Sequence, residues 1–461
     1  DTLYYFSIGV LEREESGSSS SLTKAKILYR SCTNESLIEQ RGGTPLLTML
    51  PDVFEWPIAT DDWDTSYGMN WTAEDAIAKL NEKYGKQVLI SLFIGTDDRD
   101  SNAHILHFDQ PSLGLSSRDY YVCTGPYEEA CVTYENFMTD LAKLIRTDRG
   151  LKVNDTNIRQ EVARVMMMEK EIANATDTPE DRNNPVLLYN KVPLETMNNN
   201  FTLDFDSRVF NWTLFTNKIM DTVGVPITDS EEVIVYAPNY FKRLNPVLAK
   251  YTKRQIKNIQ YKPSDCMCRD MQNYLVWRFV MNLVVGLSRQ YRETRKAFRK
   301  AIYGTTSEAA VWRQCAIYVN NNMENAVGRL YVEEAFAGDS KDMMDVMITN
   351  IREVFVSNLY DLAWMDAETK KAAEEKARAI RERIGFSENI MNNTYLDQEY
   401  QDVSGYKTKS RLKAGIHCQV TFIYIALFTI QIVSKQLYRD NRKIMQQSLF
   451  PEENSVTVQL K

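Results

Sequence analysis

The sequence predicts a mainly α-helical protein, a large helical lobe with a small β hairpin and poorly ordered N- and C-terminal segments. From Glu128 onward, apolar residues recur at helical spacing almost throughout. A short apolar run, Val88–Ile94, precedes the turn residues Gly-Thr-Asp-Asp and a second apolar run, His104–Phe108. The serine-rich stretch Ser16–Ser21 has the composition of a flexible, solvated segment.

The first half of the chain offers few clear helix signals. Leu22–Cys32 has the pattern of the end of a short helix. Thr72 is a plausible N-cap, because its hydroxyl can accept a hydrogen bond from the first helical turn, and we expect that helix to run to about Tyr84.

The second half contains longer helical patterns. Arg269–Tyr303 is apolar on more than one face, so we expect it to be deeply buried and to end at Gly304. Another helix is expected to begin at Ser307. Asp342–Trp364 predicts an amphipathic helix, and Asp366–Arg383 a charged, solvated one. The expected apolar stripe of the amphipathic helix consists of Met344, Ile348, Ile351, Phe355, Leu359 and Leu362. Methionines that cluster along the chain are interpreted as adaptable core residues, namely Met166–Met168, Met343, Met344 and Met347.

Composition excludes some classes of function. The 461 residues are enough for two or three domains, and the net charge is −7. A sequence pI near 5.4 argues against a nucleic-acid-binding protein, and no glycine-rich phosphate loop is present. The first twenty residues carry no signal-peptide pattern and the first residue is Asp1, so we expect a fragment rather than a processed chain.

Asparagine motifs favour the secretory pathway over the cytosol. Seven Asn-x-Ser/Thr triplets are a mild excess, although any single one can be ordinary polar surface. The seven cysteines alone do not separate the two compartments, and their odd number leaves at least one free or paired outside the chain. The triplets begin at Asn34, Asn70, Asn154, Asn174, Asn200, Asn211 and Asn392.

The residues alone point to no active site. His104 and His107 would point to opposite faces of a strand, and a zinc site built from His417 and three cysteines lacks a second matching ligand pair. Neither the His-Glu-x-x-His zinc motif nor a Gly-x-Ser-x-Gly elbow occurs, and three histidines make a Ser-His-Asp triad improbable. The cysteines of that candidate zinc site are Cys266, Cys268 and Cys418.

Long sequence blocks nevertheless stand out at Tyr29–Ser36, Phe93–Ser101, Asp109–Tyr121, Glu169–Thr176, Asn273–Phe279, Trp312–Phe336 and Trp364–Phe386. With these blocks, the chain resembles the neprilysin family of zinc metallopeptidases from about Lys24 to about Tyr400. The resemblance implies a type II membrane glycoprotein whose extracellular part has two lobes. A helical lobe caps a zinc-bearing, thermolysin-like lobe and admits only small peptides.

The same resemblance implies a division of the chain. Residues 1–23 form a flexible segment, 24–335 the helical domain, 336–405 a helical linker, and 406–461 a tail foreign to the family. Residues 257–269 also look inserted. We interpret both foreign segments, 257–269 and 406–461, as translated non-coding sequence or as the product of a splice variant.

Particular residues are implied as well. The resemblance pairs Cys32 with Cys315. A second disulfide, Cys123–Cys131, would close the short loop Cys-Thr-Gly-Pro-Tyr-Glu-Glu-Ala-Cys. The first pair closes a very long loop and would staple the two ends of the lobe. The glycosylation sites implied by the family are Asn34, Asn174, Asn200 and, more loosely, Asn211.

The resemblance implies that the parent protein hydrolyses small extracellular peptides on the amino side of hydrophobic residues at the plasma membrane. Because the zinc motif, the second Glu-containing motif and the Asn-Ala substrate segment are absent, this chain should hold no zinc, cleave nothing alone and contribute substrate gating. The membrane anchor would precede the chain. The alternatives are a truncated module that binds peptides or a partner, and a cytosolic helical scaffold.

One foreign segment is open to two interpretations. Residues 414–434 contain no Lys, Arg, Asp or Glu, and their length suits a bilayer. Polar residues within it weaken that interpretation, and a buried or aggregation-prone β-rich run is the alternative.

Overall fold

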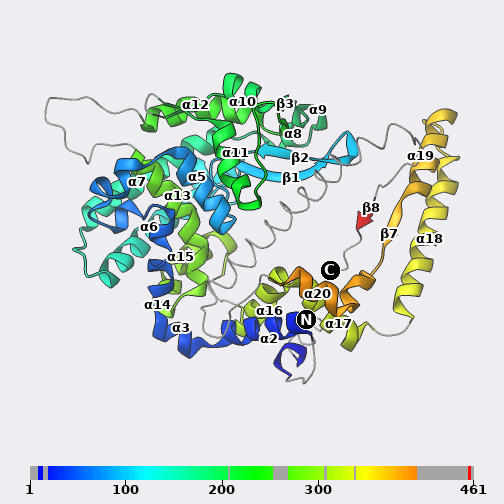
Figure 1. The fold of residues 1–461 in the computed structure, drawn as a ribbon, viewed down its shortest axis with the longest axis horizontal. Helices are drawn as coiled ribbons and strands as arrows, with labels where there is room; N and C mark the ends of the chain where they lie inside the picture. Colours follow the sequence, from blue (N-terminus) through cyan, green and yellow to red (C-terminus); the bar gives the residue numbers. More distant parts are fainter. Residues whose placement is uncertain are drawn as a thin grey trace.

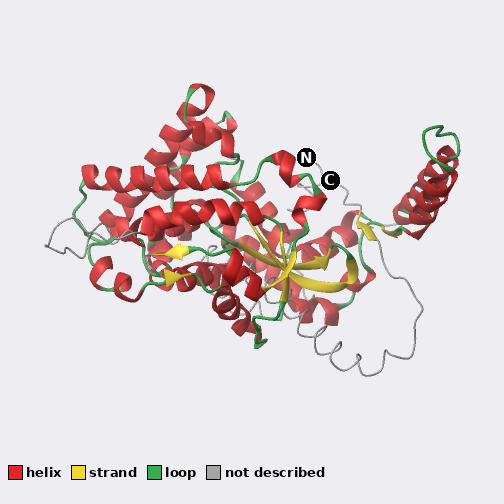
Figure 2. Cartoon of the chain, turned by 90° about the horizontal axis from the view of Figure 1, so that it is seen from above, coloured by secondary structure: helices red, strands yellow, loops and turns green. Residues whose placement is uncertain are grey.

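The computed structural model describes residues 9–13, 19–205, 208–252, 268–305, 309–336, 339–401 and 455–457. Within them the fold is mainly α-helical with little sheet, which confirms the expected fold class (Figures 1 and 2). The inserted segment up to residue 267, Ser307 and residues 402–454 lie outside this part of the chain, and so does the possible membrane segment 414–434.

A large hydrophobic core extends from Leu46 to Phe298. Five tryptophans are buried in it, and α13 crosses its middle with every residue from Asp270 to Met281 buried. The α-helices of this part of the chain are α4 (Thr44–Leu47), α5 (Ala73–Tyr84), α6 (Glu128–Asp148), α7 (Asp155–Ala175), α8 (Pro179–Arg182), α9 (Pro185–Leu188), α10 (Leu194–Asn200), α11 (Trp212–Met220), α12 (Pro238–Thr252), α13 (Cys268–Leu283), α14 (Arg289–Glu293) and α15 (Lys296–Tyr303). Short 3-10 helices link them: η1 (Leu50–Val53), η2 (Pro57–Ala59), η3 (Trp63–Thr65), η4 (Tyr67–Asn70), η5 (Arg118–Val122), η6 (Gly125–Tyr127), η7 (Asp221–Val223) and η9 (Val284–Gly286).

A four-stranded sheet lies against this core in the order β1-β2-β6-β3. The predicted hairpin is present, with β1 (Ser91–Asp97) antiparallel to β2 (Asp100–Asp109). β6 (Glu232–Val235) then pairs parallel to β2, and β3 (Lys191–Pro193) pairs antiparallel to β6. These two strands correct the expectation of helix almost throughout after Glu128. A second small hairpin joins β4 (Asp204–Phe205) to β5 (Arg208–Val209).

A second, smaller core brings together the start of the chain and residues beyond 310. Val10 and Leu11 pack with apolar residues of α2, α16 and α17, and Leu396 and Tyr400 complete the cluster. Figure 1 shows these helices gathered below the larger body. The elements here are α2 (Ser20–Thr33), α16 (Val311–Asn322), α17 (Glu324–Ala335), η10 (Glu388–Met391) and α20 (Asn393–Glu399), and α3 (Glu35–Arg41) follows α2.

A helical hairpin of α18 (Ser340–Leu359) and α19 (Ala367–Ala379) stands to one side of both cores (Figure 1). At its base, β7 (Arg381–Arg383) pairs parallel to β8 (Ser455–Thr457). Within the described residues, no helix is long and apolar enough to span a bilayer.

Several expected boundaries are corrected. Ser19 caps α2 and Ser21 is fully buried, so these two residues are not part of a flexible, solvated run. The stretch Arg269–Tyr303 is not one helix, because η9 and α14 interrupt it, although it does end at Gly304 in the left-handed conformation. The helix expected from Ser307 begins at Val311.

Candidate functional site

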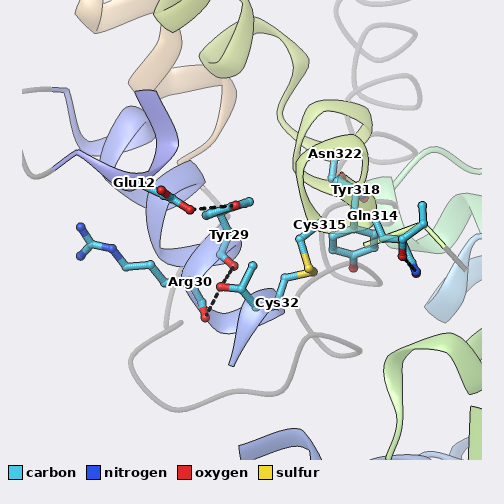
Figure 3. The surroundings of a disulfide bond; sticks show 10 residues. Glu12, Tyr29, Arg30, Cys32, Gln314, Cys315, Tyr318 and Asn322 are labelled. Atoms are coloured by element: carbon cyan, nitrogen blue, oxygen red, sulfur yellow. Dashed lines mark hydrogen bonds between the residues drawn. A yellow bond between two sulfur atoms is a disulfide. The ribbon is translucent and has the colours of Figure 1, made fainter. Parts of the chain in front are cut away.

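The long disulfide joins the two segments of the smaller core. Cys32 on α2 bonds to Cys315 on α16 across 283 residues of sequence, with their Cα atoms 5.6 Å apart. Both cysteines are fully buried. Figure 3 shows the bond where the two helices face each other. The disulfide therefore joins the start of the described chain covalently to α16, against which α2 also packs its apolar residues.

A buried tyrosine flanks this disulfide. Tyr29 lies one turn before Cys32, and its hydroxyl donates a hydrogen bond to Glu12 Oε1 at 3.3 Å (Figure 3). Burial, with the negative charge of Glu12, raises the pKa of Tyr29 to about 12. The phenol therefore stays protonated and acts as a donor at physiological pH.

The short disulfide closes the turn that leads into α6. Cys123 bonds to Cys131, with their Cα atoms 5.6 Å apart. Cys131 belongs to the large core, so each of these two disulfides is attached to a different core. Cys268 is also disulfide-bonded, which removes its sulfur from the zinc site considered above. Cys266, Cys418 and His417 lie outside the described residues.

The candidate glycosylation asparagines Asn34, Asn174, Asn200 and Asn211 are all exposed. Two of them are also helix caps: Leu37 N–H donates to Asn34 Oδ1 at 3.1 Å, and Leu214 N–H donates to Asn211 Oδ1 at 2.7 Å. Because an N-linked glycan attaches to the amide nitrogen, it leaves the capping oxygen in place. Glycosylation stays a prediction.

A buried ionic centre lies where three of the family-like sequence blocks meet, on α7, on α13 and in the loop after β2. Arg278 Nη1 lies 3.2 Å from Glu169 Oε1, and both side chains are almost fully buried. Gly114 N–H donates to the same carboxylate at 2.8 Å, and Tyr134 hydroxyl donates to Oε2 at 2.8 Å. Trp277 Nε1–H donates to the Tyr134 oxygen at 2.7 Å.

The electrostatics of this centre follow from its burial. Burial and the negative charge of Glu169 raise the pKa of Tyr134 well above its usual value. Burial, with the positive charge of Arg278, lowers the pKa of Lys86 to about 8. Both Glu169 oxygens accept hydrogen bonds and are shielded from solvent, so the carboxylate holds the loop at Gly114 in place.

A second set of ion pairs fixes the ends of the hairpin. Arg182 on α8 holds Asp109 of β2 through two hydrogen bonds of 2.6 and 2.8 Å. At the other end Asp97 accepts from Tyr189 and Lys191 at 3.0 and 3.2 Å. Burial opposes ionisation of Asp97, but these bonds and the Arg99 amide lower its pKa overall. Sequence reasoning did not single out these residues, because pairs 73 to 94 positions apart leave no local signal.

The histidines of β2 do not form a ligand pair. His107 is buried and His104 is exposed, on opposite faces of the strand as expected. The His107 ring lies 4.8 Å from the Phe93 ring, and burial lowers its pKa. Among the residues that the structure describes, no three His, Cys, Asp or Glu side chains come together to hold a metal ion.

Comparison with known families decides the assignment. The sequence model for the N-terminal region of peptidase family M13 matches residues 8–387. The chain belongs to peptidase family M13. It is 55% identical over 399 residues to neprilysin of Mus musculus, which covers 85% of this chain and 51% of that protein. It is 41% identical to membrane metallo-endopeptidase-like 1 of the same organism, over 87% of this chain and 50% of that protein.

Solved structures share the fold at low sequence identity. PepO from Lactobacillus rhamnosis superimposes with a TM-score of 0.70 at 14% identity, covering 93% of this chain and 60% of that one. The Mycobacterium tuberculosis zinc metalloprotease Zmp1 in complex with an inhibitor gives 0.67 at 17% identity, covering 93% and 58%. The M13 chain described here spans about half the length of the curated relatives that it matches.

Proposed function

We propose that this chain is the N-terminal, substrate-gating portion of a neprilysin-like zinc metalloendopeptidase that hydrolyses small extracellular peptides. The observation that carries the proposal is the 55% identity to neprilysin over a region that is only half of that protein. In such a protein a bound zinc ion would supply Lewis-acid polarisation of the scissile carbonyl, and an associated Glu would activate water. Those residues belong to the half that this chain does not match.

The part played by this chain is that of a rigid wall. Its large core, with the Glu169–Arg278 ion pair at the centre, holds the loop at Gly114 and the sheet at fixed positions. A wall of this kind would admit only small peptides to the active site, because its shape excludes larger ones. We place the protein on the extracellular side of the plasma membrane, with N-glycans on Asn34, Asn174, Asn200 and Asn211 and an anchor preceding the chain. The exposure of all four asparagines supports the proposed glycosylation.

A comparison of two proteins tests the proposal. The 461-residue chain should show no chelator-sensitive hydrolysis of a fluorogenic peptide. A chimera of residues 1–401 followed by the remaining part of mouse neprilysin should hydrolyse it and lose activity with a chelator. An inactive but folded chimera would contradict the proposal, and so would chelator-sensitive activity of the chain alone. Enzymatic deglycosylation of secreted material should lower its mass.

A further inference from the structure

The helices α14 and α15 carry a dense run of basic residues. Six Lys or Arg residues and a single Glu lie among the twelve positions 289–300, whereas the chain as a whole has a net charge of −7. Thr294 and Arg295, which join the two helices, also have right-handed helical backbone angles. Helical spacing therefore continues across the junction, and side chains three or four positions apart lie on the same side.

One side of this stretch is exposed and basic. Arg289, Lys296 and Lys300 are exposed. Arg289 Nε and Lys296 Nζ lie 3.8 and 3.1 Å from the two carboxylate oxygens of Glu293, so they share a side. Lys300 follows Lys296 by about one helical turn, and half-buried arginines form a second row beside them. Together these residues are the basic face: Arg289, Arg292, Arg295, Lys296, Arg299 and Lys300.

The opposite side of the same helices is packed into the large core. Tyr291 and Phe298 are buried there. The Phe298 ring lies 5.3 Å from the Tyr134 ring and 5.8 Å from the Phe137 ring, both on α6. Figure 1 shows α14 and α15 at an edge of the larger body, next to α3. The two helices are thus anchored by their apolar side and present the basic face to solvent.

Carboxylates beside the basic face neutralise only part of its charge. Glu293 is shared between two of the cations. Glu39 on α3 lies 3.3 Å from Arg292 Nη2. Asp148 on α6 accepts a hydrogen bond from the Tyr291 hydroxyl at 2.6 Å. Ion pairs between exposed side chains are weak and are screened by salt, so a ligand that carries many negative charges can displace them.

The exposed hairpin of α18 and α19 shows no comparable excess of positive charge. α19 is the charged helix expected over Asp366–Arg383, and three glutamates balance its four basic residues. Lys371 Nζ, for example, lies 3.9 Å from Glu375 Oε1. α18 instead exposes apolar side chains. Met343 and Met347 are 67 and 47% exposed, so their interpretation as core residues is wrong. Solvation of a surface helix alone therefore does not account for the basic face.

We propose that the basic face of α14 and α15 binds a linear sulfated polysaccharide of the glycosaminoglycan class. Runs of Lys and Arg on a protein surface are typical of sites for such polyanions. The site is separate from the proposed gating of substrates, and only the choice of an extracellular ligand rests on the proposed location of the protein.

The chemistry of the basic face favours a polysaccharide over a lipid surface. Helices that lie on membranes bury an apolar side among the lipid headgroups. Here that side is already packed against α6, and the one large exposed ring on these two helices is Tyr303, at the end of α15. Arginine forks bind oxyanions through paired hydrogen bonds, and lysines bind them as point charges. Cations that repeat along two consecutive helices therefore suit a ligand whose charges also repeat along a line.

Heparin binding by the 461-residue chain provides the test. Binding should be measurable at about 0.15 M salt and should weaken steeply as salt rises. Lys296→Ala/Lys300→Ala should weaken it about tenfold and lower the slope of log affinity against log salt by about two. Glu293→Gln should strengthen binding about threefold, because it removes the carboxylate at the centre of the face.

Lys371→Ala/Lys376→Ala on α19 is the matched control, because it removes the same charge from two exposed positions of a balanced helix. It should leave heparin affinity almost unchanged, and all variants should keep the native circular dichroism spectrum. Equal losses in the two double variants would overturn the site, as would the absence of heparin binding. Tighter binding to vesicles of phosphatidylserine and phosphatidylcholine, or to a DNA duplex, would replace the polysaccharide by a membrane or a nucleic acid.

The outcomes are independent of peptidase activity. An inactive but folded chimera contradicts the proposed function and leaves a positive heparin result standing. A chain that does not bind heparin overturns the basic face as a binding site, whatever the activity of the chimera.

Discussion

Gly114 packs directly against the buried ionic centre, with no room for a side chain. A Cβ atom there would lie 1.8 Å from the Tyr134 hydroxyl and 2.8 Å from Glu169 Oε1. Gly114→Ala should therefore destabilise the fold by about 2–3 kcal/mol, measured by denaturant unfolding. Gly328→Ala is the control, because its nearest neighbour is Ile390 Cδ1 at 4.0 Å and the site is helical. It should stabilise by about 0.5–1 kcal/mol, and equal effects of the two changes would contradict this account.

Lys86 should make stability rise with pH. Its pKa is lowered from 10.5 to about 8 in the folded state, so between these values the unfolded state binds more protons. The cost of burying its charge is fully present below pH 8 and is removed as pH rises through the window. Lys86→Met should therefore be more stable than the parent at pH 7, by about 1–2 kcal/mol after allowance for partial exposure.

Unfolding free energies at pH 7 and 9.5 check this sign. The advantage of Lys86→Met should shrink at the higher pH. Lys371→Met, at an exposed position of α19, should show no such change. An advantage that stays constant between the two pH values would show that the Lys86 charge is not the cause.

At the scale of elements, the N-cap of α5 is a feature that sequence alone identified. Thr72 Oγ1 accepts from Asp75 N–H at 3.2 Å, and the helix ends at Tyr84 as expected. Thr72→Ala should cost about 1 kcal/mol and Thr72→Ser a few tenths. Both should be measured on unglycosylated protein, because Thr72→Ala also removes the Asn70 triplet. A similar loss in both variants would mean that the methyl group, not the cap, stabilises this position.

Other elements show why sequence reasoning stopped where it did. Caps and turns are local, so α5 and the β1–β2 hairpin were predictable from a few neighbouring residues. β6 was missed because four residues are too few for a period to emerge, and its pairing with β2 joins positions about 127 apart, as in Leu106 and Val233. The Glu169–Arg278 pair likewise spans 109 residues. Glu169 and Arg278 were noticed only as parts of two family-like blocks. No rule based on sequence spacing shows that these two residues pair with each other.

At the scale of the whole molecule, two separate cores imply two unfolding units. The five buried tryptophans belong to the large core, whereas the buried aromatics of the smaller core are Tyr29 and Tyr400. Each core is joined by its own disulfide, Cys32–Cys315 in the smaller and Cys123–Cys131 in the large one. Tryptophan fluorescence therefore reports mainly on the large core, while far-ultraviolet circular dichroism reports on both.

Removing one disulfide at a time should shift the unfolding transition of one core and leave that of the other core almost unchanged. Cys32→Ser/Cys315→Ser releases a loop of 283 residues and should weaken the smaller core by about 3–5 kcal/mol. Circular dichroism should then show an early transition, with the fluorescence midpoint almost unchanged. Cys123→Ser/Cys131→Ser should instead lower the fluorescence midpoint, by about 2–3 kcal/mol in unfolding free energy. Coincident transitions for Cys32→Ser/Cys315→Ser would show that the two cores unfold as one cooperative unit.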